Sequence, residues 1–134
     1  MVALLTFWFV SRPIGAPPGW GNDFDAAVKE AAATSKGVLI AFHSANCPPC
    51  VAMDRTVLRA DVVQKAISEF IPVRVDVGQK PQVAAMFGVM ATPTYAILSS
   101  DGRLLAQTQG YQNEEEMLRF FRAGHEAERN GRRG

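Results

Sequence analysis

The sequence predicts a single α/β domain in which a central mixed β-sheet is flanked by helices. Patterns typical of helices and strands follow one another in the order helix, strand, helix, strand, helix, hairpin and helix. The length of 134 residues is that of one domain. Apolar residues make up 48% of the chain and charged residues 20%, as in soluble globular proteins that bury one core.

The first eighteen residues differ from the rest in composition. Residues 1–10 are almost wholly apolar, but a bilayer span takes about 20 residues, and no basic residue precedes the run. They are either a shortened signal or membrane anchor, or an extra strand or arm lying on the core. Residues 11–21 hold three prolines and three glycines, as a linker does. We therefore predict an N-terminal segment over 1–18, a domain over 19–124, and a charged tail over 125–134 that frays.

The first half of the domain should build two parallel strands. Asn22 or Asp23 can cap a helix that ends near Gly37. Residues 38–42 are a continuous apolar run, as in a fully buried strand. Helices follow from Cys47 and from about residue 61. Alternation over residues 73–77 then predicts a strand parallel to the first, through a right-handed crossover. In the helix from residue 61, the apolar residues expected to face inward are Val62, Val63, Ala66, Ile67 and Phe70.

The second half should add an antiparallel hairpin and a final helix. A short helix is expected over residues 81–87. Residues 94–98 and 103–109 read as strands joined by a turn at 99–102. The last helix starts at Asn113, with its apolar side chains inward.

The two cysteines, Cys47 and Cys50, lie too close together for a disulfide between them to join distant segments of the fold. Cys47 stands where the buried strand ends and a helix begins, and free N–H groups there stabilise a thiolate. Pro48 and Pro49 suit the first helical turn, which needs no N–H, and they stiffen the loop. The spacing lets Cys50 attack a mixed disulfide on Cys47. We therefore interpret the pair as a redox-active site, in which Cys47 attacks the substrate and Cys50 resolves the mixed disulfide.

Other interpretations of the two cysteines are weaker. A zinc site would need two more ligands, and only His43 and His125 remain, so we predict no metal. Two inert structural cysteines would not need the strand-to-helix setting, which is the reactive one. The net charge of +1, from 14 basic and 13 acidic side chains, gives no reason to expect nucleic-acid binding.

Three segments together resemble the thioredoxin superfamily: FHSANCPPC at 42–50, VDV at 75–77 and ATPT at 91–94. The flanking residues are most similar to thioredoxin-like domains related to the C-terminal domain of bacterial thiol–disulfide interchange proteins. They are Trp20, Met53-Asp54 and Gly110-Tyr111. The resemblance covers about residues 19–123, and it implies the thioredoxin fold.

The resemblance also implies a substrate site. Pro93 should be in the cis form, turning the Thr92 backbone toward Cys47, where an extended substrate strand can pair with it. Pro48 and Pro49 would border the same site. The reaction would need no cofactor beyond the Cys47–Cys50 disulfide. The expected partners are protein thiols or disulfides and an upstream redox protein, and we expect a monomer.

The sequence departs from the family pattern around the cysteines. Ala41 stands where thioredoxins usually carry a buried acid, which suggests a slower resolving step or another base. Arg74 matches the lysine that normally neighbours this acid, so we expect an unpaired cation that tunes the thiols. Asn46 replaces a tryptophan and makes the surface more polar. His43 either tunes the thiols, by stabilising a thiolate or acting as a base, or is a packed, hydrogen-bonded side chain.

Two functions follow. The first is a thiol–disulfide oxidoreductase, expected to act as a reductant. Residues 1–10 suggest a periplasmic or other extracytoplasmic site, with the cytoplasm as the alternative. The second is an interaction module in which the thiols are incidental or regulatory; an apolar patch around residues 86–93 would favour it.

Overall fold

The computed structural model describes residues 17–133. The apolar residues 1–10, with both interpretations of them, lie outside this range. Within it, no helix combines the length and the apolar character that a membrane crossing requires.

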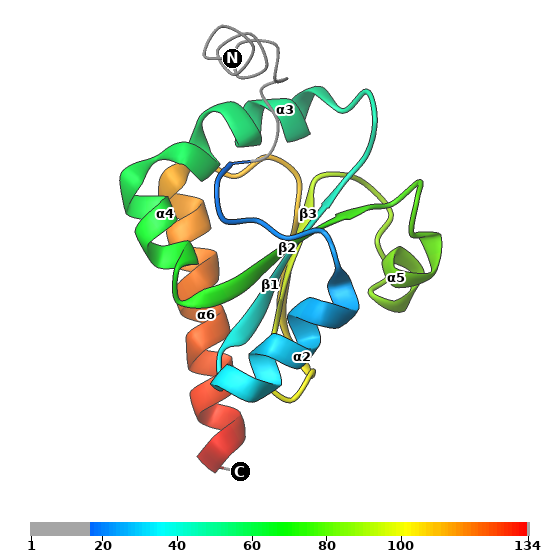
Figure 1. The fold of residues 1–134 in the computed structure, drawn as a ribbon. Coiled ribbons are helices and arrows are strands. Elements are labelled where there is room, and N and C mark those ends of the chain that lie inside the picture. Colours follow the sequence, from blue (N-terminus) through cyan, green and yellow to red (C-terminus); the bar gives the residue numbers. More distant parts are fainter. Residues whose placement is uncertain (1–16, 134) are drawn as a thin grey trace, which may run out of the picture.

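A four-stranded mixed sheet forms the centre of the domain, in the order β2-β1-β3-β4 (Figure 1). Its strands are β1 (Gly37–His43), β2 (Phe70–Asp76), β3 (Thr94–Leu98) and β4 (Leu104–Gln109). The β1–β2 pair is parallel, whereas β1–β3 and β3–β4 are antiparallel. This is the mixed sheet that the sequence predicts, with the continuous apolar run of β1 at its centre.

Helices cover both faces of the sheet (Figure 1). On one face lie α2 (Phe24–Thr34) and α5 (Pro81–Met86), against the side of β1 that carries Val38, Ile40 and Phe42. The other face is covered by α3 (Pro48–Arg55), the 3-10 turn η1 (Val57–Arg59), α4 (Asp61–Ile67) and α6 (Glu114–Arg133). The architecture is therefore the α/β layering expected from the order of elements.

Two details of the helices differ from the sequence prediction. Val62 does not face inward but is 50% exposed, and Phe70 belongs to β2 rather than to α4. The helix α4 has only seven residues, and Val63 and Ile67, one turn apart, occupy its buried stripe. Val62 stands one position before Val63 and is rotated away from that stripe.

The expected frayed tail is instead helical, because α6 continues through Arg133. The ring of His125 stacks on Phe70, with centroids 4.8 Å apart. Its Nε2 lies 2.8 Å from Glu69 Oε2, without the alignment of a hydrogen bond. These contacts anchor the helix beyond residue 124, which a charged sequence does not by itself predict.

Candidate active site

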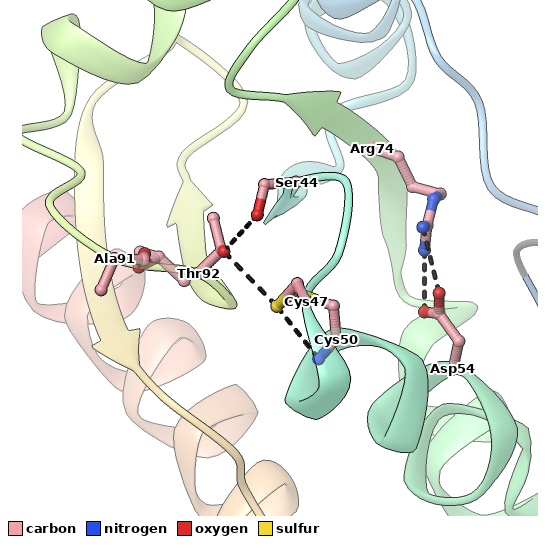
Figure 2. Close-up of a disulfide and its surroundings, with 8 residues drawn as sticks. Ser44, Cys47, Cys50, Asp54, Arg74, Ala91 and Thr92 are labelled. Carbon is pink, nitrogen blue, oxygen red and sulfur yellow. Dashed lines mark hydrogen bonds and ion pairs between the residues drawn. A yellow bond between two sulfur atoms is a disulfide. The ribbon is translucent and has the colours of Figure 1, made fainter.

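The two cysteines form a disulfide at the N-terminus of α3 (Figure 2). β1 carries the chain to this end of the sheet, and Asn46, with φ +56°, turns it into the helix; asparagine tolerates this conformation. Cys47 is the N-cap, and its Sγ accepts the Cys50 N–H at 3.3 Å. Pro48 and Pro49 occupy the first turn as predicted. Cys47 is 7% and Cys50 6% exposed.

The loop before β3 closes over Cys47 from the other side. Its Thr92–Pro93 peptide bond is cis, and Pro93 is buried with its carbonyl accepting the Gly110 N–H at 2.8 Å. The Thr92 hydroxyl donates to Cys47 Sγ at 3.4 Å. That hydroxyl is 2.7 Å from Ser44 Oγ. Residues 45 positions apart in the sequence thus meet at Cys47 Sγ.

The Thr92 main chain has no backbone partner in the described part of the chain. Among residues 17–133, neither its N–H nor its carbonyl is bonded to another backbone group. An open cleft of about 660 Å³ runs along the start of α3 and is lined by Ser44, Asn46, Cys47, Pro48, Val51, Ala52 and Arg55. Cys47 therefore borders this cleft and also contacts the loop that carries the unpaired Thr92 backbone groups.

Arg74 is not the unpaired cation that the sequence suggested. Its two terminal nitrogens donate to the two carboxylate oxygens of Asp54, at 2.8 and 3.1 Å. The side chains are 15% and 18% exposed, respectively. Figure 2 shows this pair next to the helix that carries the cysteines. A carboxylate from α3 thus meets the cation where the family pattern would place an acid on β1.

Tyr95 occupies the neighbouring position on the sheet. Ala41 pairs with Arg74 on one side and with Tyr95 on the other, so the small side chain leaves room between two large ones. Tyr95 is 2% exposed. Burial, together with the Asp54 carboxylate, raises the pKa of Tyr95 well above its usual value, so the phenol is neutral. On the sheet, the small side chain of Ala41 is therefore flanked by a neutral ring on one side and by a bidentate ion pair on the other.

His43 faces a different pocket from Cys47. This polar pocket of about 770 Å³ is lined by Trp20, Gly21, Asn22, Asp23, His43, Arg74, Asp76, Gln79 and Lys80. Burial, and next the Arg74 charge, lower the pKa of His43, so its ring is neutral at pH 7. Within residues 17–133 the ring makes no hydrogen bond, unlike the hydrogen-bonded histidine considered from the sequence. Its effect on the thiols stays a prediction.

Three residues of the site were missed in the sequence: Ser44, Asp54 and Tyr95. Asp54 carried a usable signal, because it lies one helical turn after Cys50 and therefore on the same face of α3. Ser44 and Tyr95 carried none, since their roles depend on which strands and loops meet. Across the described part of the chain, no group of three or more His, Cys, Asp or Glu side chains is arranged to hold a metal.

Comparison with known proteins identifies this arrangement. The family model described as a thioredoxin-like domain matches residues 24–125. The chain belongs to the thioredoxin-like domain family. This thioredoxin-like domain is 30% identical over 93 residues to a thioredoxin from Alicyclobacillus acidocaldarius, an alignment covering 69% of this chain and 86% of that one.

Solved structures agree with the family assignment. A thioredoxin from Thermus thermophilus superposes with a TM-score of 0.70 at 26% identity. The superposition covers 77% of the present chain and 83% of the Thermus thioredoxin. The DsbH oxidoreductase superposes with a TM-score of 0.64 at 14% identity, covering 89% and 90%, a likeness of fold alone.

Proposed function

We propose that this thioredoxin-like domain is a thiol–disulfide oxidoreductase that reduces disulfides of partner proteins through Cys47 and Cys50. The observation that carries the proposal is the disulfide at the N-terminus of α3, with Thr92 and Pro93 against it. Helix N–H groups and the Thr92 hydroxyl stabilise negative charge on Cys47, which makes it the attacking sulfur. The reaction needs no cofactor, because the two thiols hold both electrons.

The reduction takes two exchange steps. The Cys47 thiolate attacks a substrate disulfide, forming a mixed disulfide and releasing one substrate sulfur as a thiolate that takes a proton from solvent. Cys50 then loses its proton and attacks Cys47 Sγ. The Cys47–Cys50 bond forms, the mixed disulfide breaks, and the second substrate sulfur leaves as a thiolate. Two electrons pass from the domain to the substrate, and an upstream dithiol protein restores them.

Substrate would bind as an extended segment across Cys47. The free N–H and carbonyl of Thr92 offer backbone pairing, while Pro93, Pro48 and Pro49 border the contact. We further propose that the domain works as a monomer. The apolar residues 1–10 support an extracytoplasmic site, with a membrane tether as one form of it.

An interaction module is the second candidate. Met86 and Met90, on the segment leading to Thr92, are 69% and 89% exposed. Neither fills the core, and exposed methionines suit adaptable protein contacts. This surface would also serve an oxidoreductase that docks partner proteins, so reactivity must separate the two functions.

The separating experiment is a glutathione redox titration of the Cys47–Cys50 pair, read by thiol alkylation. A reversible two-electron transition supports the oxidoreductase, and its midpoint gives the direction of electron flow. A Cys50→Ala variant should trap a mixed disulfide on Cys47, whereas Cys47→Ala should trap far less. Thiols that neither cycle nor alkylate in the native protein would leave the interaction module as the function.

A further inference from the structure

Two hydroxyl groups form a chain that ends on the attacking sulfur. Ser44 Oγ lies 2.7 Å from Thr92 Oγ1, and Thr92 Oγ1 lies 3.4 Å from Cys47 Sγ (Figure 2). Ser44 comes from the segment after β1 and Thr92 from the loop before β3, and both are partly buried. Backbone pairing of substrate at Thr92 does not use either hydroxyl.

The direction of the chain follows from counting protons. Neither a disulfide sulfur nor a thiolate carries a hydrogen, so Thr92 must donate to Cys47 Sγ. A hydroxyl has one proton to donate. The Thr92 oxygen is therefore the acceptor toward Ser44, and Ser44 must donate to it. Such a chain is polarised toward the sulfur, and each bond strengthens the next.

The hydroxyl matters because the helix supplies few donors here. Prolines at positions 48 and 49 have no N–H. The Val51 N–H is used by the Cys47 carbonyl at 3.1 Å. The only backbone N–H bonded to Cys47 Sγ within residues 17–133 is that of Cys50, at 3.3 Å. The Thr92 hydroxyl is thus the second donor to a sulfur that becomes negatively charged on reduction.

We propose that Ser44 is a positioning residue that orients the Thr92 hydroxyl toward Cys47, and that the pair stabilises the Cys47 thiolate and with it the reduced protein. The inference rests on the proposed exchange chemistry of Cys47. Because the disulfide is a weak acceptor and the thiolate a strong one, the chain favours the reduced form. It sets both the pH at which Cys47 becomes reactive and the reduction potential of the pair.

The test uses matched variants of the full chain. Thr92→Val keeps the shape of the side chain without its hydroxyl, Thr92→Ser keeps the hydroxyl, and Ser44→Ala removes the outer donor. In reduced protein, thiolate absorbance and the rate of alkylation are followed against pH. Thr92→Val should raise the midpoint of the Cys47 transition by about one pH unit, the size of a hydrogen bond to a charged group.

The other variants test whether Ser44 acts on Cys47 through the Thr92 hydroxyl. Ser44→Ala should raise the midpoint by roughly half as much, because the Thr92 hydroxyl then loses its orientation and polarisation. Thr92→Ser should stay near the wild-type value. The Ser44→Ala/Thr92→Val double variant should match Thr92→Val alone. The tenfold change expected for Thr92→Val lowers the reduction potential by about 30 mV.

Two results would overturn the inference. One is a midpoint that neither Thr92→Val nor Ser44→Ala moves. The other is a Ser44→Ala shift that is the same with or without the Thr92 hydroxyl, since Ser44 would then act on its own. Thiolate absorbance reports on Cys47 even if the protein exchanges no disulfide. Failure of the hydroxyl chain is therefore distinguishable from failure of the proposed function, which the glutathione titration of the unaltered protein decides.

Discussion

Replacing Asp54 with alanine leaves the Arg74 guanidinium without its carboxylate. The two groups are joined by hydrogen bonds of 2.8 and 3.1 Å, and Arg74 is only 15% exposed. The cation cannot turn fully into water without leaving the space between β2 and α3. The variant should therefore unfold more easily, by an amount that depends on how much of the lost interaction water replaces.

The expected cost lies between two limits. Removing one partner of a fully buried pair costs about 3–5 kcal/mol. Exposed pairs contribute about 0–1 kcal/mol. The exposures of 15% and 18% place this pair nearer the first limit. We expect Asp54→Ala to reduce the free energy of unfolding by about 2–3 kcal/mol, consistent with a bond to a charged group. An Asp54→Ala/Arg74→Leu double variant should lose less than the sum of the single variants, with a coupling of about 1.5–2.5 kcal/mol.

Urea unfolding at pH 7 measures these changes in the free energy of unfolding. The oxidised protein is used so that the disulfide stays closed throughout. Glu115→Ala is the matched control. Glu115 pairs with Arg119 at 3.1 Å, but their side chains are 79% and 65% exposed. Its removal should change stability by less than about 0.5 kcal/mol. Equal losses for the two variants, or a coupling below about 0.5 kcal/mol, would refute the reasoning that burial makes the Asp54–Arg74 pair strong.

Two further predictions concern packing and pH. Gly124→Ala should destabilise the fold by about 1–2 kcal/mol despite the better helix propensity, because its Cβ would lie 2.6 and 3.0 Å from Ile97 Cδ1 and Cγ2. In Gly131→Ala, which lies in the same helix, the new Cβ would meet only the movable end of Arg103, at 3.0 Å, so this variant should stabilise the fold. Urea unfolding in which both variants change the free energy of unfolding in the same direction would contradict this reasoning. Burial lowers the pKa of His43 from 6.5, so the folded state binds fewer protons and loses stability as the pH falls through 6.5 toward the folded value. His43→Asn should lessen that loss, and a wild-type-minus-variant difference in unfolding free energy that stays constant from pH 8 to 5 would argue against it.

Local patterns account for the parts of the site that could be predicted. The apolar run of β1, followed after four residues by Cys47 and two prolines, predicts a thiol at a helix N-terminus without any knowledge of neighbours. The structure has that arrangement, with Cys47 as N-cap. The Thr92-Pro93 pair was placed against the cysteines by family resemblance, since no local rule brings residues so distant together.

Contacts between elements decided what the sequence left open. Arg74 was expected to be an unpaired cation, because position 41, where the family pattern has the acid, is an alanine. Asp54 reaches it from a helix 20 residues earlier, once β2 lies parallel to β1 and α3 covers the same face. Likewise, Ser44 and Thr92 are 48 residues apart, and no periodicity relates them.

The sequence by itself determined the order of elements, the buried central strand and the place of the Cys47–Cys50 pair at the start of a helix. These depend on short-range regularities: alternation, helical spacing, and the residues that begin a helix. Only the tertiary structure decided which groups surround the thiols and how far α6 extends. Those depend on strand register and helix packing, where many weak contacts act together over distances that no short segment encodes.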